Sequence, residues 1–308
     1  MRFVVILTKT LNDLLSLKRT IALVLLGIFF PLILSFIWRD GMLNTPMSLE
    51  KETHYIVDNF TVLLFMWVTG LCLVITVATT AAGFVSKEDT DGTLLIMVSK
   101  PINRFELVLG KFLALIINTL IIQTIILLLS VMIFWFVLPI DPETFAALLG
   151  MIPWLLLYSL LVTIVFGSIA IAFSALMKSR VKIMLVLMIL IIWIFFVGMI
   201  PRTVFSSAYE SFYLYYGDLG YHMGNTYTLL LEHTEAGQMM PQNQPFMTIF
   251  AGTYKDMNDS FDPDIGAMPP SLELTNYISA EYSTIFWLVL SAIALAIATR
   301  AIERKEVH

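Results

Sequence analysis

The chain has 308 residues, of which 58% are hydrophobic and only 13% are charged, and its mean hydropathy is +0.86. Soluble domains carry about a quarter charged residues, so this composition excludes a soluble globular protein and predicts an all-α integral membrane protein. The single cysteine, Cys72, excludes a disulfide framework, and a net charge of −5 without any basic block argues against nucleic-acid binding.

Residues 1–19 precede the first long apolar run and predict an amphipathic helix. The apolar face of that helix would carry Phe3, Val4, Leu7, Leu11, Leu14 and Leu15. The polar face would carry Arg2, Lys9, Asp13 and Ser16. This pattern is typical of a helix that lies in the membrane interface. A ragged extension of the first span is the alternative, and the continuous polar face favours the interfacial helix. The apolar run that follows is too long for a signal peptide.

The apolar stretches are each long enough to cross a bilayer as a helix of about 20 residues. They predict six transmembrane helices at residues 20–38, 60–84, 105–137, 145–177, 181–200 and 281–299. A polar loop is expected between the first two, at residues 39–59, and Pro201 is expected to end the fifth. By domain, spans one to five occupy 20–201 with a coupling loop at 85–104, followed by a segment at 202–280, span six at 281–300 and a tail at 301–308.

The charges are segregated along the chain. Of the 18 Lys and Arg residues, 14 fall in residues 1–19, 85–111, 178–182 and 300–308, whereas 16 of the 23 acidic residues fall in the other hydrophilic segments, Glu281 at the edge of span six included. By the positive-inside rule, both termini and the 85–104 loop are cytoplasmic and the 202–280 segment is extracytoplasmic. We therefore expect a multi-pass protein of the plasma (cytoplasmic) membrane.

The 202–280 segment is the longest hydrophilic part of the chain. Its aromatic first half is expected to form one or two helices, and Gln238 to Pro270 is expected to be irregular because it is rich in Gly, Pro, Asn and Asp. A lid, a docking platform for an extracytoplasmic partner and a packed spacer all remain open as its role. Its methionines and histidines suit copper, but no tight ligand cluster exists and ordinary Met usage explains them, so no metal site is predicted: Met223, Met239, Met240, Met247, Met257, Met268, His222 and His233.

The predicted spans contain no charged residue and no histidine near their centres. Charges at that depth are costly and mark ion sites and proton relays, so their absence argues against an ion-coupled transporter. The lack of a His/Glu pair on a helix argues against an intramembrane metalloprotease, and no phosphate-binding GxxxxGK[ST] loop is present. We therefore predict no catalytic residue and no cofactor in this chain, so that transport must be passive or take its energy from a partner.

Residues 84–111 interrupt this apolar chain with four acidic and four basic residues around an apolar centre, Thr93 to Val98. The centre predicts a short helix, and Pro101 forces a turn after it because the residue before a proline is pushed out of the helical region. The apolar side chains of such a helix need a partner. The residues alone leave open whether that partner is a protein in the water phase or the lipid surface.

The two ends of this stretch carry helix signals. Gly92 is expected to break the helix that continues from span two. Asn103 lies three residues before Glu106, the spacing of a capping box, and restarts a helix that enters span three. Gly110 permits close packing, and Lys111 is expected to extend toward the membrane interface.

The pattern Glu88-Asp89-x-x-Gly92-Thr93-Leu94, then Lys100-Pro101-x-x-Arg104, then Leu109-Gly110-Lys111 resembles the signature of ABC-2 (type-2 ABC exporter) permeases. It follows the second of six spans, as in that family, and the N-terminal helix and the layout of spans extend the resemblance over the chain. A weaker resemblance is to the permease group of the nitrous-oxide-reductase maturation system. The 202–280 segment departs from the family, because many members have a short re-entrant hairpin there.

This resemblance implies a non-catalytic permease subunit of an ATP-driven exporter. It would pair with a second permease, as a homo- or heterodimer, and with two cytoplasmic ABC ATPase subunits that bind ATP and Mg²⁺. Residues 88–104 would dock on the ATPase, with Leu94, Leu95 and Val98 as buried anchors and Glu88, Asp89, Lys100 and Arg104 setting the orientation; Gly92, Thr93 and Pro101 complete the coupling set. The alternative is a membrane anchor or assembly factor whose extracytoplasmic segment binds a partner protein.

Overall fold

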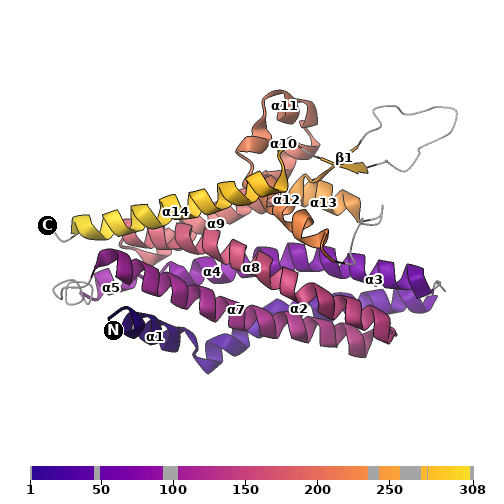
Figure 1. Cartoon of the computed structure of the whole chain (residues 1–308), viewed down its shortest axis with the longest axis horizontal. Coiled ribbons are helices and arrows are strands. Elements are labelled where there is room, and N and C mark those ends of the chain that lie inside the picture. Colours follow the sequence, from indigo (N-terminus) through magenta and orange to yellow (C-terminus); the bar gives the residue numbers. More distant parts are fainter. Residues whose placement is uncertain are drawn as a thin grey trace.

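A computed structural model describes residues 2–44, 49–92, 103–234, 243–256, 272–275 and 277–305. Within these ranges, six helical segments are long and apolar enough to cross a membrane. Figure 1 shows the long helices running along one axis, with both chain termini at the same end of the bundle, which we call the termini end. The predicted all-α, six-span architecture is confirmed, and one short antiparallel pair of strands does not alter it.

The N-terminal helix α1 (Arg2–Leu14) packs against the third span. Ile6 and Leu14 are buried, whereas Val4, which the sequence assigned to the apolar face, is 59% exposed. The contact is close because a Cβ added at Gly110 would lie only 3.1 Å from the Ile6 Cγ2 atom. A separate helix therefore precedes the first span, and its lying in the membrane interface stays a prediction.

The polar loop expected at residues 39–59 is wrong. Helix α2 (Leu17–Asn44) continues past the expected end of span one, and α3 (Leu49–Leu63) begins well before span two. The reason is amphipathicity, because Ile56 and Val57 of α3 are 2% and 3% exposed while Lys51 and His54 are exposed. A helix with one packed apolar face is stable in water even when its mean hydropathy is low.

Span two is interrupted near its middle by a π turn, η1 (Leu64–Leu71), before it continues as α4 (Cys72–Ala81). Gly70 has non-helical backbone angles there (φ −94°, ψ −106°). The freed Val68 carbonyl accepts a hydrogen bond from the Gln123 side-chain amide at 3.2 Å. A side chain at Gly70 would overlap the Phe65 carbonyl oxygen, so this distortion requires glycine.

Spans three and four are α7 (Arg104–Val137) and α8 (Pro142–Leu176), of 34 and 35 residues. At about 1.5 Å per residue each is about 50 Å long, so both project beyond a hydrocarbon core of about 30 Å. Asp141 caps α8 by accepting hydrogen bonds from the Glu143 and Thr144 amides at 2.7 and 3.1 Å. The hydrogen bond from the Thr144 hydroxyl lowers the pKa of Asp141.

Span five comprises α9 (Arg180–Ile192), the π turn η2 (Trp193–Val197) and α10 (Met199–Thr203). Pro201 lies inside α10, so the expectation that it ends the span is wrong. Proline has no amide hydrogen to donate to the carbonyl four residues earlier. The wider turn just before it, closed by the Gly198 amide onto the Trp193 carbonyl at 2.7 Å, lets the helix continue past the proline.

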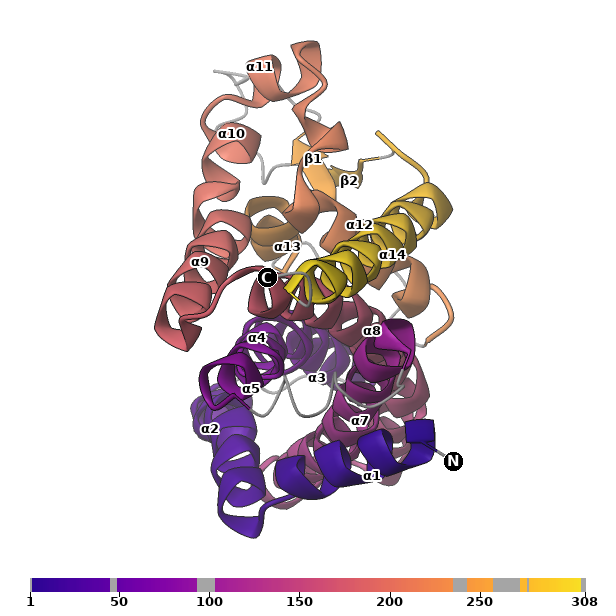
Figure 2. The same ribbon diagram turned by 90° about the vertical axis from the view of Figure 1, so that its left-hand side faces the viewer.

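The two π turns lie against each other in the bundle. A Cβ added at Gly70 of η1 would be 3.4 Å from the ring of Phe195 in η2. Below them, toward the termini end, α4 and α9 pack together, and Figure 2 shows α4 between α2 and α9. Spans two and five are therefore distorted at the same height in the bundle, whereas α7 and α8 are continuous helices.

The 202–280 segment contains more regular structure than the sequence predicted. Its elements are α11 (Ser206–Ser211), η3 (Leu214–Tyr216), α12 (Leu219–Leu231), α13 (Gln244–Ala251), β1 (Tyr254–Asp256) and β2 (Leu272–Leu274). The irregular structure expected for Gln238 to Pro270 is wrong at α13, which has proline in its first turn and ends at Gly252 (φ +69°). It is also wrong at β1, and the rest of that range, apart from 243, 252 and 253, lies outside the described residues.

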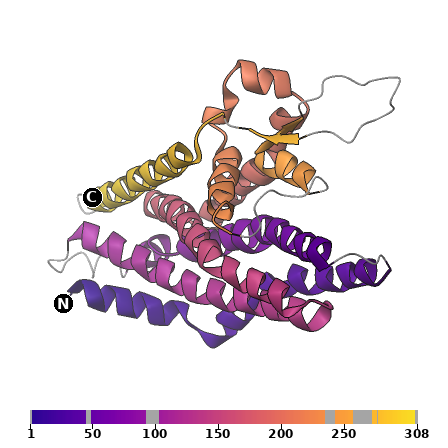
Figure 3. The same ribbon diagram turned by 45° about the vertical axis from the view of Figure 1, so that its right-hand side comes forward.

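Helix α12 is part of the bundle and not of a detachable loop. In Figure 3 it descends from the cap formed by α11 toward α3 and α8. The Tyr227 hydroxyl donates to the Thr61 carbonyl at 2.9 Å, and the Tyr158 hydroxyl of α8 donates to the Met223 carbonyl at 3.3 Å. The chain then enters span six, α14 (Ala280–Lys305), which also packs against α12.

A buried ion pair, Arg202 with Asp218, joins α10 to α12. The guanidinium binds both carboxylate oxygens, with Nε at 2.6 Å from Oδ2, and Nη1 donates to the Phe250 carbonyl of α13 at 2.6 Å. The Tyr209 hydroxyl also donates to Asp218, at 2.9 Å. Burial and the nearby carboxylate raise the pKa of Tyr209. Gly220 makes room for the guanidinium, because a Cβ there would overlap its Nη2 atom.

Candidate coupling site between spans two and three

Span two leads into the candidate coupling segment through a turn and a short helix, α5 (Ser86–Thr90). A single side chain of span four fixes this turn. The Ser174 hydroxyl accepts from the amides of Val85 and Ser86 at 3.0 and 3.1 Å, and it donates to the Ala82 carbonyl at 2.9 Å. Because these groups are buried, each needs such a partner, so the turn is held rigidly against α8.

A buried ion pair joins α5 to span three. The Lys111 ammonium donates to the Glu88 carboxylate and to the Phe84 carbonyl. The Lys111 side chain is 4% exposed and that of Glu88 is 24% exposed. The sequence predicted that Lys111 extends toward the interface, but an acceptor pair inside the protein lies within its reach. The two described ends of the chain around residues 93–102 are thus tied together.

Two arginines hold the same region from neighbouring spans. Arg19 of α2 donates to the Thr80 hydroxyl, and Arg180 of α9 donates to the Thr79 carbonyl at 3.5 Å. Both approach the C-terminal end of α4, where unpaired carbonyls carry partial negative charge and favour cations. The Thr90 hydroxyl adds a link to the Lys178 carbonyl at 3.3 Å. The α4–α5 end of span two is therefore bound to α2, α8 and α9.

Span three begins with the cap that the sequence predicted. The Asn103 side chain accepts from the Phe105 amide at 3.0 Å, and α7 begins at Arg104. Glu106 lies in the first turn, where an acidic side chain is favourable to the helix dipole. One turn further, Gly110 receives α1, so the start of span three is fixed both by α1 and by Lys111.

The structure describes only part of the predicted coupling set. Glu88 and Asp89 lie on α5, and Gly92 has the left-handed conformation (φ +71°) beyond its end. The remaining residues of the set up to Pro101 lie outside the described residues: Thr93, Leu94, Leu95, Val98, Lys100 and Pro101. Of the residues on either side, the structure brings Glu88 and Lys111 into contact, although the sequence had assigned them separate roles.

Sequence reasoning missed three side chains that hold this site, namely Arg19, Ser174 and Arg180. The two arginines had been counted only as markers of topology. Ser174 was a weaker signal, a hydroxyl close to the end of an apolar span. Such residues contact segments 61 to 101 positions away in the chain, and local pattern does not specify those partners.

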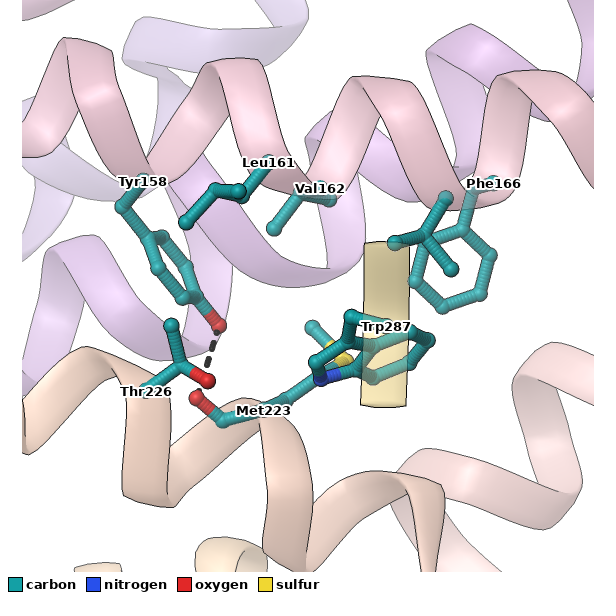
Figure 4. Close-up of a pocket in the computed structure, with 8 residues that line it drawn as sticks. Tyr158, Leu161, Val162, Phe166, Met223, Thr226 and Trp287 are labelled. Atoms are coloured by element: carbon teal, nitrogen blue, oxygen red, sulfur yellow. Dashed lines mark hydrogen bonds between the residues drawn. The ribbon is translucent and has the colours of Figure 1, made fainter. Parts of the chain in front are cut away.

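A small apolar pocket lies between α8, α12 and α14, as Figure 4 shows. Its lining residues are Tyr158, Leu161, Val162, Val165, Phe166, Met223, Thr226 and Trp287, and its empty space, open side included, is about 220 Å³. Ligand pockets usually measure about 300–1,000 Å³ and contain a few polar groups that orient the ligand. We therefore assign no substrate to this pocket.

The histidines and methionines considered for copper contact other residues of this chain wherever the structure describes them. Met223 and Met247 are buried in the core, and the His233 ring packs against the Trp154 ring at a tilt of 38°. No group of three His, Cys, Asp or Glu residues suited to a metal occurs in the described ranges. The remaining methionines of the set lie outside those ranges: Met239, Met240, Met257 and Met268.

His222 of α12 forms a buried link to span six. Its Nε2 lies 3.1 Å from the Tyr216 carbonyl and its Nδ1 lies 3.0 Å from the Ser283 hydroxyl. A carbonyl only accepts, so Nε2 carries the hydrogen and Nδ1 accepts from Ser283. This arrangement uses the neutral ring, and burial lowers the pKa of His222.

The spans, their caps and the tied crossing between spans two and three define a polytopic α-helical membrane protein. A family model described as "ABC-2 family transporter protein" matches residues 4–307. The chain therefore belongs to the ABC-2 transporter family and is a membrane component of an ABC transporter. No curated protein matches it.

Proposed function

We propose that the chain is the permease subunit of an ATP-driven ABC exporter and contains no catalytic residue itself. A separate ATPase subunit would bind ATP and Mg²⁺, and residues 88–104 would receive its movement. The observation that supports this proposal is the tie at the two ends of residues 93–102. Lys111 and Glu88 join the entry and the exit of that segment, and Ser174 fixes the entry to span four.

Force applied to residues 93–102 would reach two spans at once, α4 through α5 and α7 through Lys111. The π turns η1 and η2 lie where spans two and five meet. Their irregular hydrogen bonding makes them the natural points of bending in these spans. Because Arg180 links α9 to α4, while Ser174 and Lys111 tie the end of α4 to α8 and α7, the parts of these spans nearest the termini would move together as one unit.

The complete complex would hold two ATPase subunits and a second permease, which is either a copy of this chain or a homologue. The charge distribution supports a plasma-membrane protein with both termini cytoplasmic, because the Arg and Lys residues at the termini end face the same side. An uncharged membrane interior favours a lipid-like, peptide or otherwise hydrophobic cargo over a small ion.

The test is Leu95→Asp in the complex purified through a tag on this chain. We expect ATPase activity to co-purify with the wild type, and we expect the variant to lose transport and the coupled part of ATP hydrolysis while the chain stays folded. A buried carboxylate in a docking groove is unfavourable by several kcal/mol. Leu274→Asp is the matched control, because Leu274 is 44% exposed in β2 at the opposite end and should tolerate the charge.

Full transport and ATP hydrolysis in Leu95→Asp would refute the coupling role. The anchor or assembly alternative gives the opposite pattern, since it expects changes in residues 88–104 to have little effect. Its own test cannot delete the whole segment at 206–275, because that removes the buried helix α12 and its contacts with α8 and α14. Substitutions on the exposed surface of the segment are needed instead.

A further inference from the structure

The chain between span five and α12 exposes an unusual number of large apolar side chains. We call residues 204–216 the aromatic elbow. Six of its side chains are between 44% and 74% exposed: Val204, Phe205, Phe212, Tyr213, Leu214 and Tyr216. The only charged residue in the elbow is Glu210, and its carboxylate accepts a hydrogen bond from the Tyr277 hydroxyl at 2.6 Å. A surface that faces water usually carries about a quarter charged residues.

The elbow is held between the end of span five and the beginning of span six. It begins directly after α10, which ends at Thr203. Its Tyr215 stacks on Tyr277, with ring centroids 4.7 Å apart and an angle of 7° between the rings. Tyr277 lies three residues before α14 begins at Ala280. Figures 1 and 2 show α11 at the end of α10, away from the long helices α7 and α8.

The exposed apolar surface of span five continues onto the elbow. Side chains three or four residues apart form one stripe along α9, η2 and α10, and all are at least 43% exposed: Val181, Leu185, Ile189, Trp193, Phe196 and Ile200. Val204 continues this spacing, at 69% exposure. On the first turn of span six, Tyr282 is also 69% exposed. No charged side chain separates the surface of the span from that of the elbow.

The inner side of the elbow is a rigid support. Tyr209, Tyr215 and Tyr221 are buried in one cluster, against which Tyr277 packs. Tyr213 has a left-handed backbone (φ +54°, ψ +36°), which is unfavourable for a bulky residue. The surrounding cluster holds that conformation, and its result is that the Tyr213 ring is 62% exposed beside the rings of Tyr215 and Tyr216.

We infer that the aromatic elbow inserts into the boundary between lipid headgroups and acyl chains, in the leaflet where spans five and six end. Aromatic rings concentrate at this depth because the ring is apolar and the tyrosine hydroxyl reaches the headgroups. The continuous apolar surface, the position at the ends of two spans and the scarcity of charge all select lipid as the occupant. This inference rests on the membrane spans alone and would survive failure of the proposed coupling role.

The test measures depth in the bilayer with spin labels. Cys72 is the only cysteine, so Cys72→Ala gives a background in which Phe212→Cys and Tyr216→Cys each carry one nitroxide. Ile293→Cys in span six, 53% exposed, is the lipid reference, and Glu232→Cys, exposed at the end of α12, is the water reference. The full chain is reconstituted in vesicles of phosphatidylcholine with a minor share of phosphatidylglycerol, and collisions with oxygen and with a water-soluble nickel chelate are compared.

We expect both elbow labels to collide several-fold less with the nickel chelate than the label at 232, and more with oxygen, approaching the label at 293. Collision rates equal to those at 232 would show that the elbow faces water and would overturn the inference. Shielding from both reagents would show a protein cover and would also overturn it, with dipolar broadening identifying that cover as a second copy. Two label sites and a melting curve of each variant guard against a local folding defect.

Discussion

Arg202–Asp218 and Lys111–Glu88 both bury their cation, yet their carboxylates differ in exposure, since the Asp218 side chain is 11% exposed and that of Glu88 is 24% exposed. Asp218 receives both arms of the Arg202 guanidinium, the Tyr209 hydroxyl and the amides of Gly220 and Tyr221. Glu88 is bound by the Lys111 ammonium, and its side chain is 24% exposed. The first pair lies at the end of span five opposite the termini, and the second lies at the termini end.

Removing a charge from water is favourable only when good geometry and further hydrogen bonds compensate the lost hydration. The Arg202–Asp218 pair meets this condition almost completely, so it acts as a rigid joint between α10, α12 and α13. The Lys111–Glu88 pair keeps one partner near water. It can therefore open at lower cost, which suits a contact beside a segment that is proposed to move.

The largest effect is expected from Arg202→Met. It leaves the Asp218 carboxylate buried without its cation, and breaking such a pair usually costs about 3–5 kcal/mol. We expect a matching loss in the free energy of unfolding, measured in detergent with a chemical denaturant. Arg39→Met is the control, because Arg39 is exposed and its loss should change stability by at most about 0.5 kcal/mol. Equal effects of the two substitutions would contradict the rigid joint.

A smaller loss is expected from Lys111→Met, about 1–3 kcal/mol, because Glu88 can turn toward water. Adding Glu88→Gln should restore part of that loss, since the uncompensated charge is then gone. A double-mutant cycle in the unfolding experiment measures this coupling. Strictly additive losses would mean that the two side chains do not interact, and the comparison between the two pairs would lose its basis.

Gly70→Ala tests the π turn η1, which lies between the two ion pairs. The new methyl group would overlap the Phe65 carbonyl, so the π turn must shift, at an expected cost of about 1–3 kcal/mol. Gly150→Ala in α8 is the matched control. Apart from its chain neighbours and the adjacent backbone of α8, no described atom lies within 4 Å of its added Cβ, and replacing a helical glycine should stabilise the chain by up to about 1 kcal/mol. Similar melting temperatures for the two variants would show that the distortion at Gly70 is not required.

The smallest effect concerns pH. Burial holds the pKa of His222 below its ordinary value of 6.5, with Asp218 the charged group that opposes the shift. The unfolded chain therefore binds more protons in this range, so stability is fully present above that value and falls as the pH falls below it. We expect a lower melting temperature at about pH 5 than at about pH 7, and a weaker pH dependence in His222→Asn. An unchanged dependence would assign the effect to other groups.

Hydropathy was enough to predict the six spans, and the capping-box spacing was enough to predict the cap at Asn103, because both signals are local. The loop expected at 39–59 failed because α3 has an amphipathic pattern with a low mean hydropathy. The burial of α12 could not be predicted from the sequence either. Its partners, Thr61 and Tyr158, lie more than 60 residues away, and nothing in its own pattern specifies them.

The candidate site divides in the same way. The motif around Gly92 and Asn103 was visible because backbone breaks and caps have short signatures. The pairing of Lys111 with Glu88 was not visible, since it depends on the register at which spans two and three pack. The apolar set from Leu94 to Val98 lies outside the described residues, so its docking on an ATPase stays a prediction from sequence.

The hydrogen bond from Tyr227 to the Thr61 carbonyl connects span two to α12. The other end of span two is connected to the candidate coupling segment through α5. A backbone carbonyl cannot rotate away as a side chain does, so a displacement of the helix at Thr61 must stretch this bond or carry α12 with it. Through α12 the displacement would reach the Arg202–Asp218 joint and the aromatic elbow. Contacts within this chain thus connect the coupling segment at the termini end with the aromatic elbow at the opposite end.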